Sequence, residues 1–259
     1  MVPELDRPKT DRGAADREPP TDWKTLVKTQ VRRRYDYLAS AHDFPPDGAG
    51  RAAAHGYRSA DLVTLPAPIV EAYSGSGNPL TDVDLADVRL AVDLGCGAGI
   101  DALLGSAALA HSFDDGAMLV ALDFAPEMIR RLVGSADNKT IRPMVADMEA
   151  LPLAANIADL VIANASFNLC VDADRAFAEA YRILVPGGRL AAADFVRNGP
   201  LPPEAAQNPM AWNASIGGVM AENALIEALG QAGFEDIAIT GHRDAPPVTA
   251  VRITAVKPD

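Results

Sequence analysis

Cysteine is scarce in this sequence of 259 residues, which contains only Cys96 and Cys170. Two cysteines are too few for a disulfide framework in a chain of this length. No apolar run approaches the length that spans a bilayer, and residues 1–20 lack the apolar segment of a secretory signal. We therefore expect a soluble, cytoplasmic protein without a membrane partner. Aromatic residues make up only 5% of the chain, so Ala, Leu and Val must fill most of its core.

Basic residues are outnumbered, since 23 Lys and Arg face 35 Asp and Glu and give a net charge of -12. Such an acidic protein repels phosphate backbones and anionic membrane surfaces, which argues against nucleic acid as a partner. A neutral or cationic small molecule, or a protein, fits the charge better. A simpler explanation of the acidic charge is that it keeps the protein soluble and has no connection with a partner. The oligomeric state is left open.

The pattern of the chain changes at residue 21. Residues 1–20 mix charged residues, Pro and Gly with almost nothing apolar, which is typical of a disordered tail. From Thr21 onward apolar residues recur at helical spacing and predict an amphipathic helix over about 22–40, with Thr21 or Asp22 as its cap. The length of 259 residues suits one domain with an extension, or at most two small ones, and the 49% of hydrophobic residues can form a sizeable core.

After residue 80, short apolar runs alternate with helical patterns. Strands are predicted at 89–94, 117–124, 141–147, 159–164 and 189–196, and helices at 99–109, 126–133, 173–184 and 221–234. A turn at Pro186-Gly187-Gly188 is expected to precede the strand at 189, and two antiparallel strands are expected within 235–256. Apolar strands that alternate with helices predict an α/β fold whose parallel sheet is covered on both faces.

Two glycine-rich segments, "YSGSGNPL" at 73–80 and "DLGCGAGI" at 93–100, lie close together. The second lies where a strand meets a helix, so that its glycines let the backbone approach a ligand near free N–H groups. A dinucleotide loop would read G-x-G-x-x-G, whereas Gly95, Gly97 and Gly99 are here followed by Ile100. This spacing argues against a pyrophosphate and favours a ligand with a ribose and an amino-acid tail.

Polar residues also stand at the ends of the next three predicted strands. Asp123 can accept hydrogen bonds from two ribose hydroxyls, although an NAD site also expects an acid there. Asp147 can accept from an adenine amino group, or alternatively cap a helix. Asn164 ends the fourth strand.

Taken in order, "VDLGCGAG", "LDFAPEMI", "ADMEALPL", "DLVIAN" and "YRILVPGGRL" resemble the class I S-adenosylmethionine-dependent methyltransferases over about 89–196. The resemblance implies a Rossmann-like seven-stranded sheet with its last strand antiparallel, and S-adenosyl-L-methionine as the cofactor. It implies that the cofactor-binding residues are Asp93, Gly95, Gly97 and Gly99 for methionine and ribose, Asp123 for the ribose hydroxyls, Asp147 and the Met148 backbone for adenine, Asn164 near the methionine amino group, and also Phe124.

Four further segments, "GYRSADLVTLP", "GSGNPL", "NASFNL" and "WNASIGGVM", are similar to the arsenite methyltransferases, and this likeness spans most of 56–240. In that family the first glycine loop reads Gly-Cys-Gly-Asn-Pro and lies beside the acceptor pocket. The resemblance implies that four residues line the substrate pocket: Ser76, Asn78, Ala165 and Ser215. It implies an N-terminal helical cap and acceptor loop at 21–80, and a core at 81–259 with an insertion at about 197–220, where Pro200, Pro202 and Pro203 predict a loop.

The chain departs from that family where arsenic would bind. The family's cysteines correspond to Ser76, Ala165 and a position near Ser215. Arsenic(III) is soft and is held by thiolates, which neither serine nor alanine supplies. The remaining cysteines, Cys96 and Cys170, are interpreted as small buried hydrophobes. We therefore expect neither arsenic methylation nor a metal site.

Methyl transfer from a sulfonium is an in-line displacement, in which the protein mainly aligns donor and acceptor. No catalytic base is assigned; the candidates are Tyr35, His55, Tyr57 and Asn168, each with an ordinary structural alternative. The preferred hypothesis is a methyltransferase for a small molecule, a specialised metabolite, whose N, O, S or C acceptor is open. The alternatives are residual methylation of a metalloid or thiol, and a protein that binds the cofactor without methylating.

Overall fold

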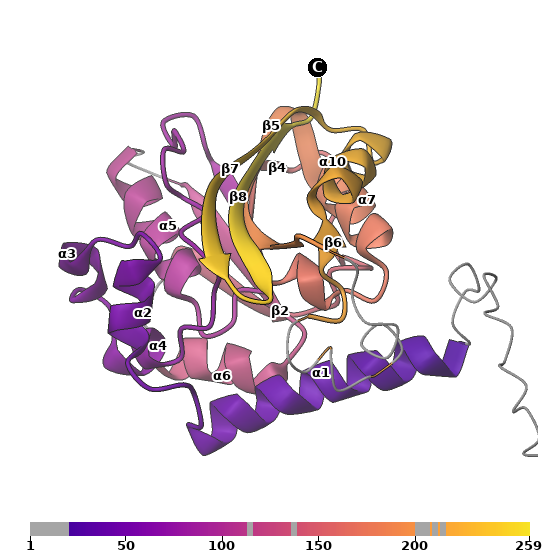
Figure 1. Ribbon diagram of the computed structural model, residues 1–259. Helices are drawn as coiled ribbons and strands as arrows, with labels where there is room; N and C mark the ends of the chain where they lie inside the picture. The colour runs from indigo at the N-terminus through magenta and orange to yellow at the C-terminus, as the bar shows by residue number, and fades with distance from the viewer. Residues whose placement is uncertain (1–20, 113–115, 136–138, 200–207, 209–211, 213–215) are drawn as a thin grey trace, which may run out of the picture.

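The computed structural model describes residues 21–112, 116–135, 139–199, 208, 212 and 216–259 (Figure 1). The predicted disordered tail at 1–20 lies outside these residues. The same holds for Pro200, Pro202, Pro203 and Ser215, so that most of the predicted insertion loop is not described.

One mixed sheet forms the centre of the molecule, in the order β3-β2-β1-β4-β5-β8-β7. Its strands are β1 (Leu90–Leu94), β2 (Met118–Asp123), β3 (Ile141–Val145), β4 (Ala158–Asn164), β5 (Leu184–Arg197), β7 (Glu235–Ala245) and β8 (Val248–Val256). Strands β1 to β5 pair in parallel, whereas β8 is antiparallel to both β5 and β7. The predicted α/β fold, with seven strands and the last one antiparallel, is confirmed. A two-residue strand, β6 (Met220–Ala221), adds to it by pairing with β5.

Helices cover both faces of the sheet, as the alternation of strands and helices predicts (Figure 1). They are α1 (Thr21–Ala41), α2 (Gly48–Ala54), α3 (Ser59–Leu62), α4 (Ala67–Glu71), α5 (Ile100–Ser112), α6 (Pro126–Ser135), α7 (Ala173–Ile183) and α10 (Glu222–Gln231), with a 3₁₀ turn, η1 (Phe167–Leu169). Helices α7 and α10 lie on one face, and α5 lies on the other with α2 to α4 beside it.

Alternate side chains of each strand enter separate cores, because successive residues of a strand point to opposite faces. In β1, Val92 and Leu94 pack in the core under α7 and α10, while Ala91 packs in the core under α5. Both cores contain many alanines and few aromatic residues, as the composition requires.

The predicted turn at Pro186-Gly187-Gly188 does not precede β5 but lies within it. Ala158 pairs with Leu184 and Leu160 pairs with Arg189, so the four residues between Leu184 and Arg189 bulge out of the register. Gly187 has φ of +72°, a left-handed conformation that costs glycine little. The backbone at 187 and 188 still bonds to Lys257, with two N···O distances of 2.8 Å. The strand therefore bends at these glycines without ending.

Helix α1 is long and lies across the molecule beside α6, below the sheet in Figure 1. Its buried Val27 and Val31 pack against Trp212. Towards its C-terminal end, Asp36 accepts a hydrogen bond from the backbone N–H of Glu127 at 3.0 Å. These contacts place α1 against the edge of the sheet at which the parallel strands β1 to β4 end.

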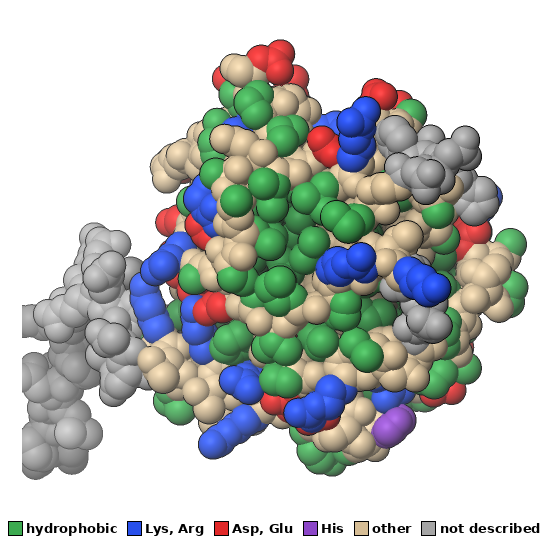
Figure 2. All heavy atoms as spheres, turned by 180° about the vertical axis from the view of Figure 1, so that it is seen from behind, with side chains coloured by type: hydrophobic (Ala, Val, Ile, Leu, Met, Phe, Trp, Pro, Cys, Tyr) green, Lys and Arg blue, Asp and Glu red, His purple; other side chains and the backbone are tan. Residues whose placement is uncertain are grey.

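The reverse face of the molecule carries hydrophobic side chains in its middle, with Lys and Arg side chains around and below them (Figure 2). Among the described residues, no helix has both the length and the apolar character needed to cross a membrane.

Candidate functional site

A cavity with an empty volume of about 800 Å³, part of it open to solvent, lies at the carboxyl ends of the parallel strands. In open α/β sheets this is the edge at which ligands bind. Its wall includes residues that follow β1 to β4 and residues of α1: Lys28, Val31, Arg32, Tyr35, Ser74, Gly95, Gly97, Asp123, Phe124, Asp147, Met148, Glu149, Asn164, Ala165, Ser166, Leu169 and Cys170.

The glycine loop after β1 forms part of the cavity wall. Gly95, Gly97 and Gly99 all have positive φ, at +74°, +54° and +99°. A Cβ at Gly95 would lie 2.5 Å from the Cβ of Ser166, and one at Gly99 would lie 2.4 Å from Leu132 Cδ1. A Cβ at Gly97 would meet nothing within 4 Å. Gly95 and Gly99 are therefore required by packing as well as by backbone conformation, whereas Gly97 leaves space free beside the cavity.

Asp123 ends β2 and is fixed by the glycine loop. Its Oδ2 accepts a hydrogen bond from Gly97 N at 2.9 Å, and its Oδ1 accepts one from Ala125 N at 2.7 Å. Burial raises the pKa of Asp123 to about 6 although these backbone bonds oppose the shift. The next residue, Phe124, lies below the guanidinium of Arg32, whose Cζ is 5.9 Å from the ring centroid.

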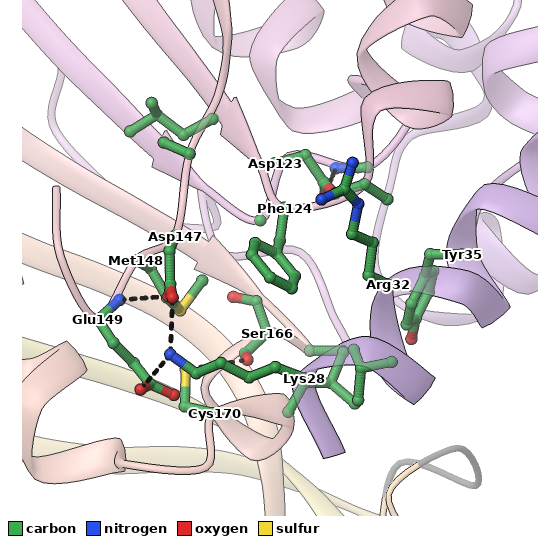
Figure 3. A pocket seen from close by; sticks show the side chains of 18 of the residues that line it. Lys28, Arg32, Tyr35, Asp123, Phe124, Asp147, Met148, Glu149, Ser166 and Cys170 are labelled. Atoms are coloured by element: carbon green, nitrogen blue, oxygen red, sulfur yellow. Dashed lines mark hydrogen bonds and ion pairs between the residues drawn. The ribbon is translucent and has the colours of Figure 1, made fainter. Parts of the chain in front are cut away.

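Asp147 stands two residues after β3 and turns its carboxylate towards α1 (Figure 3). Its Oδ1 accepts a hydrogen bond from Glu149 N at 2.9 Å, and its Oδ2 accepts one from Lys28 Nζ at 2.6 Å. The Lys28 ammonium is also 2.6 Å from Oε2 of Glu149. Burial alone would lower the pKa of Lys28, but its hydrogen bonds to the two carboxylates raise it above the ordinary value. Met148 lies between the two acids on the cavity wall.

Asn164 ends β4 and joins the sheet to the N-terminal segment. Its Nδ2 lies 2.9 Å from both Tyr57 Oη and Asp101 Oδ2, and 2.8 Å from the carbonyl oxygen of Gly77. Its Oδ1 accepts a hydrogen bond from Ser76 N at 2.9 Å. The amide of Asn164 is therefore occupied by protein groups.

Asp101 lies at the centre of the same network and is 4% exposed. Tyr57 donates a hydrogen bond to its Oδ1 at 2.6 Å. Burial raises the pKa of Asp101 to about 6. A smaller cavity, with an empty volume of about 340 Å³, is lined by Asp101, Asn164, the glycine loop and residues Tyr73 to Gly75.

Asp93 is 1% exposed and lines neither of these cavities. Within the described part of the chain its Oδ2 has no hydrogen-bond partner. Burial, and then the neighbouring Asp101 and Asp123, raise the pKa of Asp93 well above the usual range. The side chain thus lies behind the glycine loop rather than in the cavity.

The residues predicted to line a substrate pocket are only partly brought together. Ala165 lines the main cavity with φ of +51°, an unusual conformation for alanine. The wall of the main cavity does not include Ser76 or Asn78, but it does include Ser74 of the same loop. Ser76 is 2% exposed because its N–H bonds to Asn164 and its carbonyl accepts from Arg243 at 2.7 Å.

Asn78 lies outside the wall of the main cavity and is likewise held by hydrogen bonds within the protein. Its Oδ1 accepts from Leu80 N at 3.0 Å and its Nδ2 donates to the carbonyl of Gly56 at 3.3 Å, so that it stabilises the loop. Ser215 lies outside the described residues.

Of the four catalytic candidates, Tyr35 lines the main cavity and the other three do not. His55 Nδ1 is 2.9 Å from Tyr73 Oη, and burial and the nearby Arg243 lower the pKa of His55. Tyr57 is buried, and burial followed by the charge of Asp101 raises its pKa well above the usual range, so it remains a donor. Asn168 is 3% exposed and borders a different, smaller pocket beside Asp194.

Both cysteines are buried, as predicted. Burial is the largest of the causes that raise the pKa of Cys96 and of Cys170 well above the usual range, so both remain thiols. Cys170 lines the main cavity, where its Sγ is 3.7 Å from the carbonyl oxygen of Ser166. The described residues contain no group of three or more His, Cys, Asp or Glu side chains that could hold a metal ion.

Sequence reasoning missed several residues of the site. They are Lys28, Arg32, Ser74, Asp101, Glu149 and Ser166. Lys28 and Arg32 lie four residues apart on the helix from which only Tyr35 was a site candidate, and their spacing relative to Val31 and Tyr35 could have indicated one shared face. Asp101 directly follows the glycine-rich segment 93–100 and lies in the first turn of α5. This position could have indicated its place in the site.

Comparison with known proteins agrees with this geometry. Residues 92–192 match the family model of a methyltransferase domain. The chain is similar to the arsenite methyltransferase of Halobacterium salinarum, with 32% identity over 168 residues that cover 64% of this chain and 42% of that protein. It is also similar to the malonyl-[acyl-carrier protein] O-methyltransferase of Methylococcus capsulatus, with 39% identity over 129 residues, 49% of this chain and 42% of that protein. The chain thus spans less than half the length of these relatives.

A solved structure extends the likeness over more of the fold. The arsenic(III) S-adenosylmethionine methyltransferase CrArsM of Chlamydomonas reinhardtii matches 83% of this chain and 74% of its own, with a TM-score of 0.65 and 22% identity. The fold is therefore the Rossmann-like class I methyltransferase fold, and over 64% of its length the chain is similar to an arsenite methyltransferase.

Proposed function

We propose that this protein binds S-adenosyl-L-methionine in the main cavity and transfers its methyl group to a small molecule. The observation that carries the proposal is the convergence of Gly97, Asp123 and Asp147 on one cavity, although they lie at or just after the ends of three different strands. The match of residues 92–192 to a methyltransferase domain supports the same cofactor.

The polar groups of the cavity fit the parts of this cofactor. Asp123 supplies a carboxylate for the ribose hydroxyls, and Gly97 leaves the space that a Cβ would fill. Asp147 and the backbone of Met148 face the region of the base. We assign the methionine portion to the smaller cavity, where Asp101 offers a buried carboxylate to an ammonium group beside Gly95 and Gly99. Asp93 acts on this portion only through the loop, because it lies behind it.

The role of Asn164 changes with this assignment. Its amide already bonds to Tyr57, Asp101 and the Ser76 loop. We therefore assign it to holding Asp101 and the N-terminal segment in place beside the methionine portion. A direct bond to the amino group would require Asn164 to give up one of these partners.

The protein contributes to the reaction mainly by alignment. S-adenosylmethionine supplies an activated methyl group on a sulfonium when it is bound. Tyr35, Ser74 and Ala165 lie on the wall of the same cavity and are assigned to positioning the acceptor. Helix α1 contributes Lys28, Arg32 and Tyr35 to the cavity wall, and we assign it to limiting the access of water. Alignment and exclusion of water are together sufficient for a nucleophile that needs no deprotonation.

The acceptor is proposed to be a small specialised metabolite rather than arsenite. Relatives of this chain are named for acceptors as different as arsenite and malonyl-[acyl-carrier protein], so the relationship alone does not choose. Ala165 presents no ligand atom, and the two thiols are buried and protonated. These features disfavour a soft metalloid. The net charge of -12 likewise disfavours nucleic acid.

We assign residues 21–80 to the cap and acceptor loop, and 81–259 to the core with its insertion at about 197–220. In support, Val31, Tyr35 and Ser74 of the cap share the cavity with residues of the core.

Incubation with methyl-labelled S-adenosylmethionine and a small-molecule extract of the source cell tests this function. The proposal predicts one labelled product, resolved by mass, and an equivalent amount of S-adenosylhomocysteine. Labelled product that forms only with added arsenite would favour the metalloid alternative. Binding of the cofactor without any S-adenosylhomocysteine would favour a protein that binds it and does not methylate.

A further inference from the structure

Lys28 is the one described cation whose ammonium joins Asp147 and Glu149 on the wall of the cavity (Figure 3). It comes from α1, more than a hundred residues away in the chain from both acids. In Figure 3 its side chain extends from the helix alongside the cavity to reach them. Both N···O distances are 2.6 Å, short enough for strong charge-assisted hydrogen bonds.

The two acids are held from behind by the backbone. Asp147 Oδ1 takes the N–H of Glu149, so Oδ2 is the oxygen that meets Lys28. Glu149 Oε1 takes the N–H groups of Val171 and Asp172 at 2.8 and 3.1 Å, and Oε2 meets Lys28. With one oxygen fixed by the backbone and the other by the ammonium, each carboxylate has a defined orientation.

We propose that Lys28 is a positioning residue for the cofactor's base: it fixes the Asp147 carboxylate so that Oδ2 accepts the adenine amino group. This inference rests on the proposed function, since it assumes an adenine at Asp147. A carboxylate oxygen has two lone pairs, so Oδ2 can accept from Lys28 and from the amino group together. Without the ammonium, Asp147 is free to turn away from the cavity and the neighbouring Glu149 loses its counter-charge.

Lys24 provides a matched control on the same helix. It forms the other described ion pair between α1 and this part of the core, with Asp172 Oδ2 at 3.2 Å. Lys24 is not part of the cavity wall. The variant Lys24→Met therefore removes one ion pair from α1 and Lys28→Met removes two, but only Lys28→Met leaves Asp147 without its partner.

Two ligands that differ at the base separate positioning from anchoring of the helix. S-adenosylhomocysteine carries the amino group, and S-inosylhomocysteine carries a carbonyl oxygen in its place. Calorimetry should show that the wild-type protein binds S-adenosylhomocysteine with a dissociation constant roughly tenfold or more below that of S-inosylhomocysteine. A tenfold difference corresponds to about 1.4 kcal/mol, which is about the contribution of one good hydrogen bond. Lys28→Met should narrow the preference to within about threefold, Lys24→Met should keep it, and Lys28→Arg should restore most of it.

Other results overturn the inference. Equal loss of affinity for both ligands in Lys28→Met would mean that Lys28 only anchors α1. The same conclusion would follow if Lys24→Met reduced the preference for S-adenosylhomocysteine as much as Lys28→Met does. An unchanged preference in Lys28→Met would exclude a role at the base. If thermal unfolding shows that Lys28→Met is not folded, Lys28→Gln takes its place in the same comparison. Absence of any binding to the wild-type protein is a different result, because it refutes the proposed function itself.

Discussion

Replacement of Asp123 by Asn tests the part of the site on which the ribose is proposed to depend. The carboxylate accepts two backbone N–H groups, from Gly97 at 2.9 Å and Ala125 at 2.7 Å. An amide keeps the size of the side chain but has only one acceptor atom. Its NH₂ group must therefore face a backbone N–H or the ribose hydroxyls. Because an NH₂ group donates hydrogen bonds and does not accept them, it cannot replace the carboxylate oxygen at either place.

The expected loss follows from these contacts. Hydrogen bonds to a charged group contribute about 1.5–3 kcal/mol each. We assume that one ribose hydroxyl loses such a bond and that the other faces the NH₂ group in place of an acceptor. The binding free energy then falls by about 3 kcal/mol, which raises the dissociation constant roughly a hundredfold. We expect Asp123→Asn to weaken the binding of S-adenosylhomocysteine by that factor in calorimetry at neutral pH.

Asp159 gives the control for this experiment. Its carboxylate also accepts two backbone N–H groups, from Arg89 at 2.8 Å and Leu90 at 2.9 Å, at the opposite ends of the strands. Asp159→Asn should lower the melting temperature without weakening the ligand. A dissociation constant for Asp123→Asn within about threefold of the wild type would refute the ribose assignment, because two lost contacts cannot cost so little.

Three other predictions concern pH, the glycine loop and the cysteines. The pKa values of Asp101 and Asp123 are raised to about 6 by burial; the folded state therefore holds these protons more tightly than the unfolded one. The stability of the ligand-free protein should fall as pH rises from 4 to above 6, while the affinity for S-adenosylhomocysteine increases as both acids ionise; thermal unfolding and calorimetry that show no change over this range would contradict the assignment. Gly97→Ala should weaken binding at least about tenfold by filling open space, whereas Gly116→Ala, at φ of +104° with nothing within 4 Å, should leave binding intact; equal effects would argue against a ligand at Gly97. Cys96→Ser and Cys170→Ser should leave turnover of the labelled product unchanged, and a large loss in either would restore the thiol alternative.

The strands and the positions of the glycine loop could be predicted because they depend on local patterns. Apolar runs such as 159–164 form β4 wherever their neighbours lie, and three closely spaced glycines between a strand and a helix require special backbone angles. The bend in β5 could not be predicted in the same way. It depends on Lys257, which bonds to the bulge from the end of the chain.

The cavity wall was harder to predict where a loop decides which side chain turns inward. The sequence indicates that 73–80 approaches the cavity, but Ser74 rather than Ser76 lines it, because Asn164 and Arg243 hold the backbone of Ser76. Likewise, Asn164 was correctly expected at the end of β4, but its partners Tyr57 and Asp101 come from distant segments. Lys28 is part of the site only because α1 crosses the strand ends, and such a contact depends on tertiary packing.

The central claim is that this cavity holds a sulfonium nucleoside. Isothermal calorimetry of the purified protein with S-adenosylmethionine and S-adenosylhomocysteine tests it most directly, with NADH as the comparison. The account predicts saturable heat with one site for each of the first two ligands and none for NADH. Saturable heat with NADH, and none with either sulfur nucleoside, would contradict it.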